Sequence, residues 1–341
     1  MKYTQLGRTG LTVSRLALGC MSYGDPSWRP WILDARAAEP FFTSALDAGI
    51  TFFDTAPFYG DDGFGESLMA DFLRSHRDEI VLTTKCGYDL SADARRPAQQ
   101  RERPHDWRPE SIRRQCDDSL RRLGIDVIDL YQLHNTRIEP ILDDDLWACL
   151  EDLRSEGKVR HLGVALGPAI GWVEEGLESI RQRPICSLQT VYNVLEQEPG
   201  RTFAAQARES GGEVGLISRV PHASDSLSGK VTRDTKFPAG DHRAHRNRDN
   251  MLDNFEKAET LGFLWSEGTG RTIGQAAVAG ILANPAFCCV IPTVLSVEDV
   301  REYAAGADRP LTADESTELA ARWDRNFDHV DRYVMPLKSS V

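Results

Sequence analysis

The chain has 341 residues, 41% of them hydrophobic, and a formal net charge of −12 at pH 7. A chain of this length can bury one large core or two modest ones, and the acidic balance argues against nucleic acid and anionic membranes as partners. The sequence has no apolar run of the about 18 residues that a membrane span needs, and its N-terminus lacks the apolar core of a signal peptide, so we expect a cytoplasmic protein.

The first residues predict a small β-hairpin, in which KYTQL and LTVS flank a turn at Gly7-Arg8-Thr9-Gly10. After the hairpin, short apolar segments alternate with amphipathic segments, which predicts a regular succession of strands and helices. The expected strands are Leu16–Cys20, Thr51–Thr55, Ile80–Cys86, Val127–His134, Arg160–Leu166, Ile185–Val191, Gly215–Arg219 and Cys288–Pro292.

Helical patterns lie between these strands. One of them begins at Pro109 and is followed by Gly124, the usual order of proline and glycine at helix ends. The expected helices cover residues 35–48, 66–74, 109–123, 144–157, 170–181, 201–210, 272–282 and 297–305. Two further patterns, 250–265 and 312–325, fall outside the strand–helix repeat.

Eight strand–helix units in a row indicate a parallel sheet that closes into a (β/α)8 TIM barrel. Such a barrel needs roughly 250 residues, so the two additional helices and the long loops account for the rest of a single domain, residues 1–341. An open doubly wound sheet is the alternative. It is weakened because no strand is followed by a G-x-G-x-x-G turn, and GDDGFG at residues 60–65 has the wrong spacing.

Cysteine and histidine spacings do not indicate a metal site. The seven cysteines match neither a ligand pair nor a disulfide framework, so we expect small buried hydrophobic side chains. His242 and His245 stand in the basic stretch DHRAHRNR, for which a solvated loop or a contact to an anionic ligand is the better interpretation. The cysteines are Cys20, Cys86, Cys116, Cys149, Cys186, Cys288 and Cys289.

Asp54 stands in the apolar segment TFFDT, where a carboxylate is costly unless a cation or hydrogen-bond donors meet it. Three neighbouring strands end with Asp54, Lys85 and His134, and Tyr59 lies on the loop after the second strand, so all four can meet at one mouth of a barrel. We expect Lys85 to pair with Asp54 and to lower the pKa of Tyr59. His134 would donate a hydrogen bond to a carbonyl oxygen, and the set suits protonation of a carbonyl during hydride delivery. Each residue alone has an ordinary structural explanation, such as a buried ion pair.

Six segments in register with this alternation resemble the aldo-keto reductase superfamily: GITFFDTAPFYG, LTTKCG, DLYQLHN, GKVRHLGVA, LQTVYN and VIPTVLSVEDV. The resemblance covers nearly the whole chain and implies a (β/α)8 barrel whose bottom is plugged by the hairpin. It also implies NAD(P)H-dependent reduction of an aldehyde or ketone, or oxidation of the alcohol, without a metal. Tyr59 would be the general acid/base, tuned by Lys85 and Asp54, and His134 would orient the substrate oxygen.

The same resemblance implies a nicotinamide-binding rim, in which Gln189 would hold the carboxamide of the nicotinamide. Ser224, Ser226 and Lys230 would surround the pyrophosphate in the loop after the seventh strand. The other implied contacts are Cys20, Met21, Arg219, Val220, His222, Pro292, Thr293, Ser296, Asp299 and Tyr303.

Several positions depart from the pattern of the family. Ala165 and Leu166 replace the Ser and Asn that many members use to bind the carboxamide. Asp225 fits a pyrophosphate loop only if it faces away from the phosphates. Thr293 and Asp299 stand where much of the family has cations for the 2′-phosphate of NADP. A carboxylate repels a phosphate but accepts hydrogen bonds from ribose hydroxyls, so these residues favour NADH, although NADPH is the default of the family.

The substrate side is less defined. Tyr23, Trp28 and Trp31 would form an aromatic wall against an apolar or sugar-ring substrate, although packing of the loop onto the first helix explains the two tryptophans equally well. The polar stretch 91–107 predicts a flap over the mouth. Nothing in the sequence indicates an oligomer. Two alternatives stay open: a nicotinamide-binding redox sensor with little turnover, which the intact catalytic set argues against, and a sugar 1-dehydrogenase.

Arg219 stands two residues before a proline, where the family usually stacks an aromatic ring on the nicotinamide. A guanidinium also stacks on a ring but repels the cationic oxidised nicotinamide, so we expect a bias towards reduced cofactor and carbonyl reduction. Arg219→Tyr should tighten the binding of oxidised cofactor more than that of reduced cofactor, as measured by fluorescence titration of both forms. Equal changes for the two forms would contradict this prediction.

Overall fold

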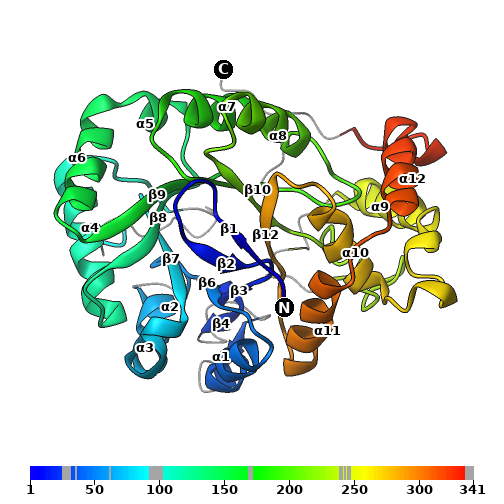
Figure 1. Ribbon diagram of the computed structural model, residues 1–341, viewed down its shortest axis with the longest axis horizontal. Helices are drawn as coiled ribbons and strands as arrows, with labels where there is room; N and C mark the ends of the chain where they lie inside the picture. Colours follow the sequence, from blue (N-terminus) through cyan, green and yellow to red (C-terminus); the bar gives the residue numbers. More distant parts are fainter. Residues whose placement is uncertain are drawn as a thin grey trace.

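The computed structural model describes residues 1–24, 32–34, 37–60, 63–91, 103–167, 172–237, 241, 243 and 247–334. Eight parallel strands hydrogen-bond side by side in chain order and curl into a barrel (Figure 1). They are β3 (Ala17–Gly19), β6 (Phe52–Asp54), β7 (Val81–Cys86), β8 (Ile128–His134), β9 (Val159–Ala165), β10 (Ser187–Val191), β11 (Gly215–Arg219) and β12 (Phe287–Ile291). All eight expected strands are confirmed, with ends that differ by one or two residues at most positions.

The first and last strands meet and close the sheet. Leu16 forms a parallel bridge with Val290, and the Val290 N–H donates to the Arg15 carbonyl oxygen at 3.1 Å. The barrel therefore leaves no open edge between β12 and β3, and the predicted (β/α)8 fold class is confirmed.

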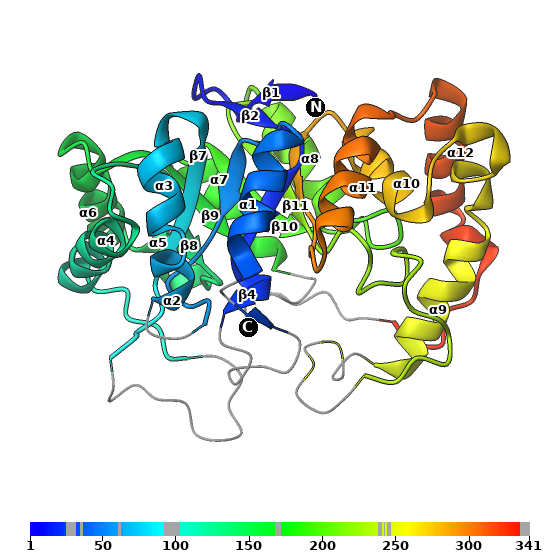
Figure 2. The same ribbon diagram turned by 90° about the horizontal axis from the view of Figure 1, so that it is seen from below.

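The amino-terminal hairpin lies across one end of the barrel (Figure 2). It pairs β1 (Tyr3–Gln5) with β2 (Thr12–Ser14) in antiparallel register. Leu6 and Val13 of the hairpin are fully buried in a cluster with Phe52 and other residues of the strands. This apolar plug closes the amino-terminal end of the barrel and leaves functional side chains to the opposite end.

Helices cover the outside of the barrel (Figures 1 and 2). As expected, α4 (Pro109–Leu123) begins at its proline and ends at Gly124, whose left-handed conformation lets its N–H donate to the Leu120 carbonyl oxygen. The other helices are α1 (Ala38–Asp47), α2 (Phe64–Ser67), α3 (Ala70–His76), α5 (Ile138–Leu142), α6 (Asp144–Ser155), α7 (Val173–Gln182), α8 (Gly200–Glu209), α9 (Arg248–Glu259), α10 (Ile273–Leu282), α11 (Val297–Asp308) and α12 (Ala313–Asp324). The helix expected at 66–74 is two helices, α2 and α3, and α5 is one that the sequence pattern does not indicate. The structure also has a short parallel pair, β4 (Tyr23–Gly24) with β5 (Leu33–Asp34).

The two helices outside the repeat, α9 and α12, pack beside α10 on one side of the molecule (Figure 1). A second apolar cluster joins these helices to the loop that follows β11, and its members include Leu261, Leu264, Leu319, Phe327, Ala223 and Leu227. The additional helices therefore support the loop in which the sequence predicts the pyrophosphate contacts.

All seven cysteines are buried and carry free thiols, which confirms that they serve as small apolar side chains. Among the helices in the described ranges, none is long and apolar enough to cross a membrane.

Candidate active site

Polar side chains gather at the carboxyl ends of neighbouring strands. Asp54 and His134 end β6 and β8, Lys85 is the penultimate residue of β7, and Gln189 lies in the middle of β10. Tyr59 stands on the loop between β6 and α2. All five side chains are buried, so each of them must find its partners within the protein.

Lys85 is the centre of this group. Its ammonium Nζ donates to Asp54 Oδ1 at 2.7 Å, to the Thr55 carbonyl oxygen at 2.8 Å and to the Tyr59 hydroxyl oxygen at 3.2 Å. These contacts use all three N–H groups of the ammonium. The ion pair that the sequence predicts for Asp54 is therefore present. Because Lys85 donates to the Tyr59 oxygen, the phenolic hydrogen is left for a different acceptor.

The pKa values of this group differ from the expectation. Burial raises the pKa of Tyr59 above its ordinary value, although the Lys85 ammonium acts to lower it. Burial alone would lower the pKa of Lys85, but Asp54 and Tyr59 outweigh it and raise that pKa. The expected lowering of the Tyr59 pKa is therefore wrong, because desolvation of the phenolate exceeds the attraction of the ammonium. At neutral pH the site holds a phenol beside an ammonium.

His134 lies next to the phenol. The two rings are perpendicular, with centroids 5.9 Å apart. Burial, together with the positive charges of Lys85 and Arg219, lowers the pKa of His134 well below its ordinary value. The His105 Nε2 atom is 3.1 Å from the His134 carbonyl oxygen, which holds the end of β8 in place. His134 is therefore a neutral imidazole that can offer one N–H.

Gln189 and Arg219 link more distant strands to this group. The Gln189 Nε2 atom donates to Asp54 Oδ2 at 3.1 Å, so that both carboxylate oxygens have partners. Arg219 Nη1 donates to the Leu166 carbonyl oxygen at 3.1 Å, just past the end of β9. The guanidinium thus reaches from β11 across to β9 at the mouth of the barrel.

The loop after β11 has an unusual backbone. Val220, Ala223, Ser224 and Asp225 all adopt positive φ angles, which is rare for residues other than glycine and most costly for the β-branched valine. Consecutive residues of this kind can turn their N–H groups towards an anion. The Ser226 hydroxyl is buried and has no hydrogen-bond partner among the described residues. A loop with these features fits a bound diphosphate.

Two side-chain contacts hold this loop. Asp225 pairs with Arg243, which also binds Asp241 at 2.7 Å. The Asp225 charge is therefore matched by a guanidinium, which removes the difficulty that the sequence raises for this residue. His222 packs against Tyr303 of α11 with ring centroids 4.3 Å apart.

Asp299 lies in the first turn of α11 and is almost fully buried. Its Oδ2 atom accepts from the N–H groups of Leu295 and Ser296 at 3.0 and 3.2 Å, and its Oδ1 atom pairs with Lys230. Burial acts to raise the pKa of Asp299, but Lys230 and the backbone donors outweigh it and lower that pKa. The carboxylate stays ionised and neutralises the charge of Lys230.

The comparisons with known proteins decide the family. The aldo/keto reductase family model matches residues 15–324. The chain belongs to the aldo/keto reductase family. It is 33% identical to the uncharacterized oxidoreductase YrpG of Bacillus subtilis, over 89% of this chain and 90% of that one. It is 30% identical to the NADH-specific methylglyoxal reductase of Escherichia coli, over 93% and 97%. The holo form of aldo-keto reductase AKR11C1 from Bacillus halodurans superposes with a TM-score of 0.74 at 28% identity, over 94% and 96%.

Membership confirms the predicted family and, with it, an NAD(P)H-dependent oxidoreductase that acts on a small-molecule carbonyl or alcohol. Most of the predicted cofactor residues lie at the end of β11, in the loop after it, and in the segment from Pro292 to the first turn of α11, whereas Gln189 lies on β10 and Tyr303 lies farther along α11. Met21 is partly exposed just after β3.

Two predicted ligand contacts are placed in the core. Tyr23 is fully buried and packs against Phe41 and Phe42 of α1, with ring centroids 5.0 and 5.9 Å apart. This position does not fit a substrate-facing wall, because the apolar face of α1 covers the ring. Cys20 is also fully buried, with its sulfur 3.6 Å from that of Met69. Trp28, Trp31, His242, His245 and residues 92–102 of the expected flap lie outside the described residues.

Sequence patterns missed several residues of the site. Thr55 contributes only a backbone carbonyl, which no side-chain motif can indicate. His105 comes from the end of the stretch predicted as a flap, and only the fold brings it to His134. Glu66 has the pattern of an ordinary helical residue, but it is fully buried between Thr84 and Arg122. A glutamate directly after a glycine-rich turn is the one available signal for it.

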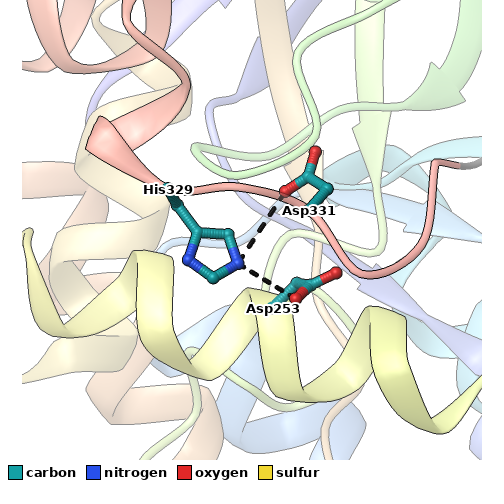
Figure 3. Close-up of side chains that lie close together, drawn as sticks. All are labelled: Asp253, His329 and Asp331. Carbon is teal, nitrogen blue, oxygen red and sulfur yellow. Dashed lines mark hydrogen bonds and ion pairs between the residues drawn. The ribbon is translucent and has the colours of Figure 1, made fainter.

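One cluster away from the barrel mouth has the side chains of a metal site (Figure 3). His329 Nε2 lies 2.9 Å from Asp253 Oδ1 and 4.0 Å from Asp331 Oδ1. Both carboxylates already have cationic partners, since Arg332 binds Asp253 at 2.7 Å and Lys257 binds Asp331 at 2.6 Å. These contacts describe a salt-bridge network that ties the C-terminal segment to α9.

The neutrality of His134 can be measured. Burial and two nearby cations lower its pKa, so the imidazole should stay neutral from about pH 5.5 to 8, where an unperturbed histidine changes its charge. We expect the ring proton shifts of His134, assigned by comparison with His134→Gln, to be constant over this range in NMR spectra. A titration with its midpoint near the ordinary value would show that the site is wetter or less cationic than described.

Proposed function

We propose that Tyr59 is the general acid that protonates the carbonyl oxygen of a small aldehyde or ketone, with Lys85, Asp54 and His134 as its partners. The observation that carries the proposal is the Lys85 ammonium, which binds Asp54 Oδ1 at 2.7 Å and the Tyr59 oxygen at 3.2 Å in a fully buried position. A buried ammonium is costly unless acceptors meet it, and here one of its three acceptors is the hydroxyl oxygen of Tyr59.

The side chains supply complementary parts of a proton transfer. Tyr59 is protonated at neutral pH, since the ordinary pKa of a phenol is about 10 and burial raises the pKa of Tyr59 further. As its proton leaves, the Lys85 ammonium stabilises the phenolate that forms, and Asp54 keeps the ammonium charged and in place. His134, as a neutral imidazole, offers an N–H to the same carbonyl oxygen as negative charge develops on it.

The residues present fit a nicotinamide dinucleotide. Gln189 would hold the carboxamide. The loop from Val220 to Ser226 would bind the diphosphate through the Ser226 hydroxyl and through backbone N–H groups other than those of Ala223 and Ser226, which donate within the loop. When bound, this group supplies the hydride to the carbonyl carbon. Arg219, held by the Leu166 carbonyl oxygen, would adjoin the ring and disfavour its cationic oxidised form.

The adenosine end supports NADH as the preferred cofactor. A 2′-phosphate needs cationic partners, but Lys230 is already paired with Asp299, and Thr293 is uncharged. Asp299 lies in the first turn of α11, where its carboxylate holds Lys230 and would compete with a phosphate for that cation, while the same carboxylate would accept hydrogen bonds from ribose hydroxyls. A relative that is 30% identical is an NADH-specific reductase, which agrees with this preference.

Tyr59→Phe tests the catalytic proposal. Removing the hydroxyl removes the proton donor, so kcat should fall about 10²- to 10⁴-fold, the usual contribution of a general acid. The assay follows absorbance of the reduced cofactor with a panel of aldehydes and ketones that includes methylglyoxal. Because the phenyl ring remains, the Kd of the reduced cofactor should stay within about threefold of the wild-type value.

The same assay separates this proposal from a redox sensor. A wild-type protein that binds reduced cofactor at micromolar concentration but turns over no carbonyl would favour the sensor. A Tyr59→Phe variant with wild-type kcat would show that another group donates the proton.

Asp299→Asn tests the cofactor preference. The wild-type protein should bind NADH more tightly than NADPH. The substitution frees Lys230 and removes a repelling charge, so it should tighten NADPH binding about tenfold or more, equivalent to about 1.4 kcal/mol, and change NADH binding far less. Glu298→Gln is the matched control, because Glu298 is exposed in the same helical turn. A wild-type preference for NADPH, or equal effects of the two substitutions, would refute the inference.

A further inference from the structure

We propose that Glu66 is a positioning residue for the proton transfer: by binding both Thr84 and Arg122, it fixes the loop of Tyr59 against the strand of Lys85. The inference rests on the proposed function, since it assigns Glu66 to the Tyr59–Lys85 pair. The Glu66 carboxylate binds Thr84 and Arg122, and neither of these residues belongs to the proposed catalytic set.

The loop after β6 is tied to the residue next to Glu66. The Gly65 N–H donates to the Tyr59 carbonyl oxygen at 2.7 Å, and the Thr55 hydroxyl donates to the Gly65 carbonyl oxygen at 3.0 Å. A side chain at Gly65 has no room, because its Cβ would lie 2.8 Å from the Tyr59 Cβ. Tyr59 and Gly65 therefore move together, and whatever anchors residues 65 and 66 also sets the place of the phenol.

Glu66 is that anchor. It is fully buried, and each of its carboxylate oxygens has a partner. The Thr84 hydroxyl donates to Oε1 at 2.6 Å, and Arg122 Nε donates to Oε2 at 2.7 Å. Thr84 directly precedes Lys85 in β7, and the two side chains point to opposite faces of the strand. Glu66 therefore binds the outer face of β7 at Thr84, one residue before Lys85, whose side chain points into the barrel.

Helix α4 supplies the second partner of Glu66, the Arg122 guanidinium. The Arg122 side chain lies directly against Gly63, whose positive φ and missing Cβ make that close approach possible. Burial raises the pKa of Glu66, while Arg122 and Thr84 oppose the shift. A buried ion pair of this kind contributes little net stability compared with apolar residues. Unlike apolar residues, the pair between Glu66 and Arg122 fixes the position of the Tyr59 loop.

The proton-transfer geometry is sensitive to that position. The Lys85–Tyr59 contact of 3.2 Å is at the long end of the ordinary hydrogen-bond range, so a small shift of the loop breaks it. A displacement of about 1 Å in a catalytic group can cost roughly 10²-fold in rate. Loosening the anchor should therefore lower kcat without removing any catalytic side chain.

The test compares Glu66→Gln with Glu175→Gln. Glu175 is equally buried, on α7, and pairs with Arg137 at 3.2 Å, far along the chain from the Tyr59 loop. Glu66→Gln should lower kcat roughly 10- to 100-fold, with KM for the carbonyl and Kd for reduced cofactor within about threefold of wild type. Glu175→Gln should leave kcat within about twofold of wild type, although both variants lower Tm.

A second pair of variants, at Thr84, distinguishes loss of the hydrogen bond to Glu66 from a general loss of folding. Thr84→Val removes the hydroxyl that Glu66 accepts while keeping the volume of the side chain, and it should lower kcat about tenfold. Thr84→Ser keeps the hydroxyl and should restore kcat to within about twofold of wild type. The proposal is overturned if Thr84→Val has wild-type kcat, or if Glu175→Gln loses as much kcat as Glu66→Gln.

Failure of the proposed function gives a different result. If the wild-type protein reduces no carbonyl, that function fails, and amide hydrogen exchange then decides the positioning role. The Gly65 N–H should exchange faster in Thr84→Val than in Thr84→Ser, because its hydrogen bond to Tyr59 opens more often. Equal exchange rates in the two variants would show that the anchor does not hold the loop.

Discussion

The buried ion pair between Lys85 and Asp54 is the interaction on which the rest of the site depends. A fully buried ammonium is stable only where acceptors surround it, and Lys85 has three, at 2.7, 2.8 and 3.2 Å. One is a carboxylate from the neighbouring strand, one is a backbone carbonyl and one is the Tyr59 oxygen. The phenol is thus one of the groups that stabilise the buried ammonium, and in the proposed mechanism the ammonium in turn would stabilise the phenolate that forms when Tyr59 gives up its proton.

The same pair explains why the catalytic half of the site could be predicted from sequence. A carboxylate at position 54 contradicts the apolar pattern of its strand, and the register of a parallel barrel brings the end of the next strand beside it. His134 follows from the same rule. The direction of the Tyr59 pKa did not follow, because the sequence identifies the charges near a group but not the solvent that the fold removes from it.

The proposed cofactor half of the site was harder to predict from the sequence, for a different reason. Lys230 and Asp299 are 69 residues apart, and Asp225 and Arg243 are 18 residues apart. Neither ion pair follows from a helical or strand periodicity in the sequence. Tyr23 shows the converse: an aromatic residue beside a predicted mouth has the same sequence signal whether it faces a ligand or, as here, packs into the core against α1.

The two halves therefore differ in how readily they can change. The proton-transfer half is built on β-strands, and each of its charged groups is satisfied by others, so replacing one leaves a buried charge unpaired. The proposed cofactor half depends on ion pairs nearer the surface: the Lys230 side chain is 44% exposed, while that of its partner Asp299 is 4% exposed. Substitution of Lys230 removes a cation that water already solvates in part, and Asp299 keeps its two backbone donors. If the proposed assignment holds, substitution at one or two of these positions would change the cofactor preference, while the geometry proposed for proton transfer stays fixed by the core.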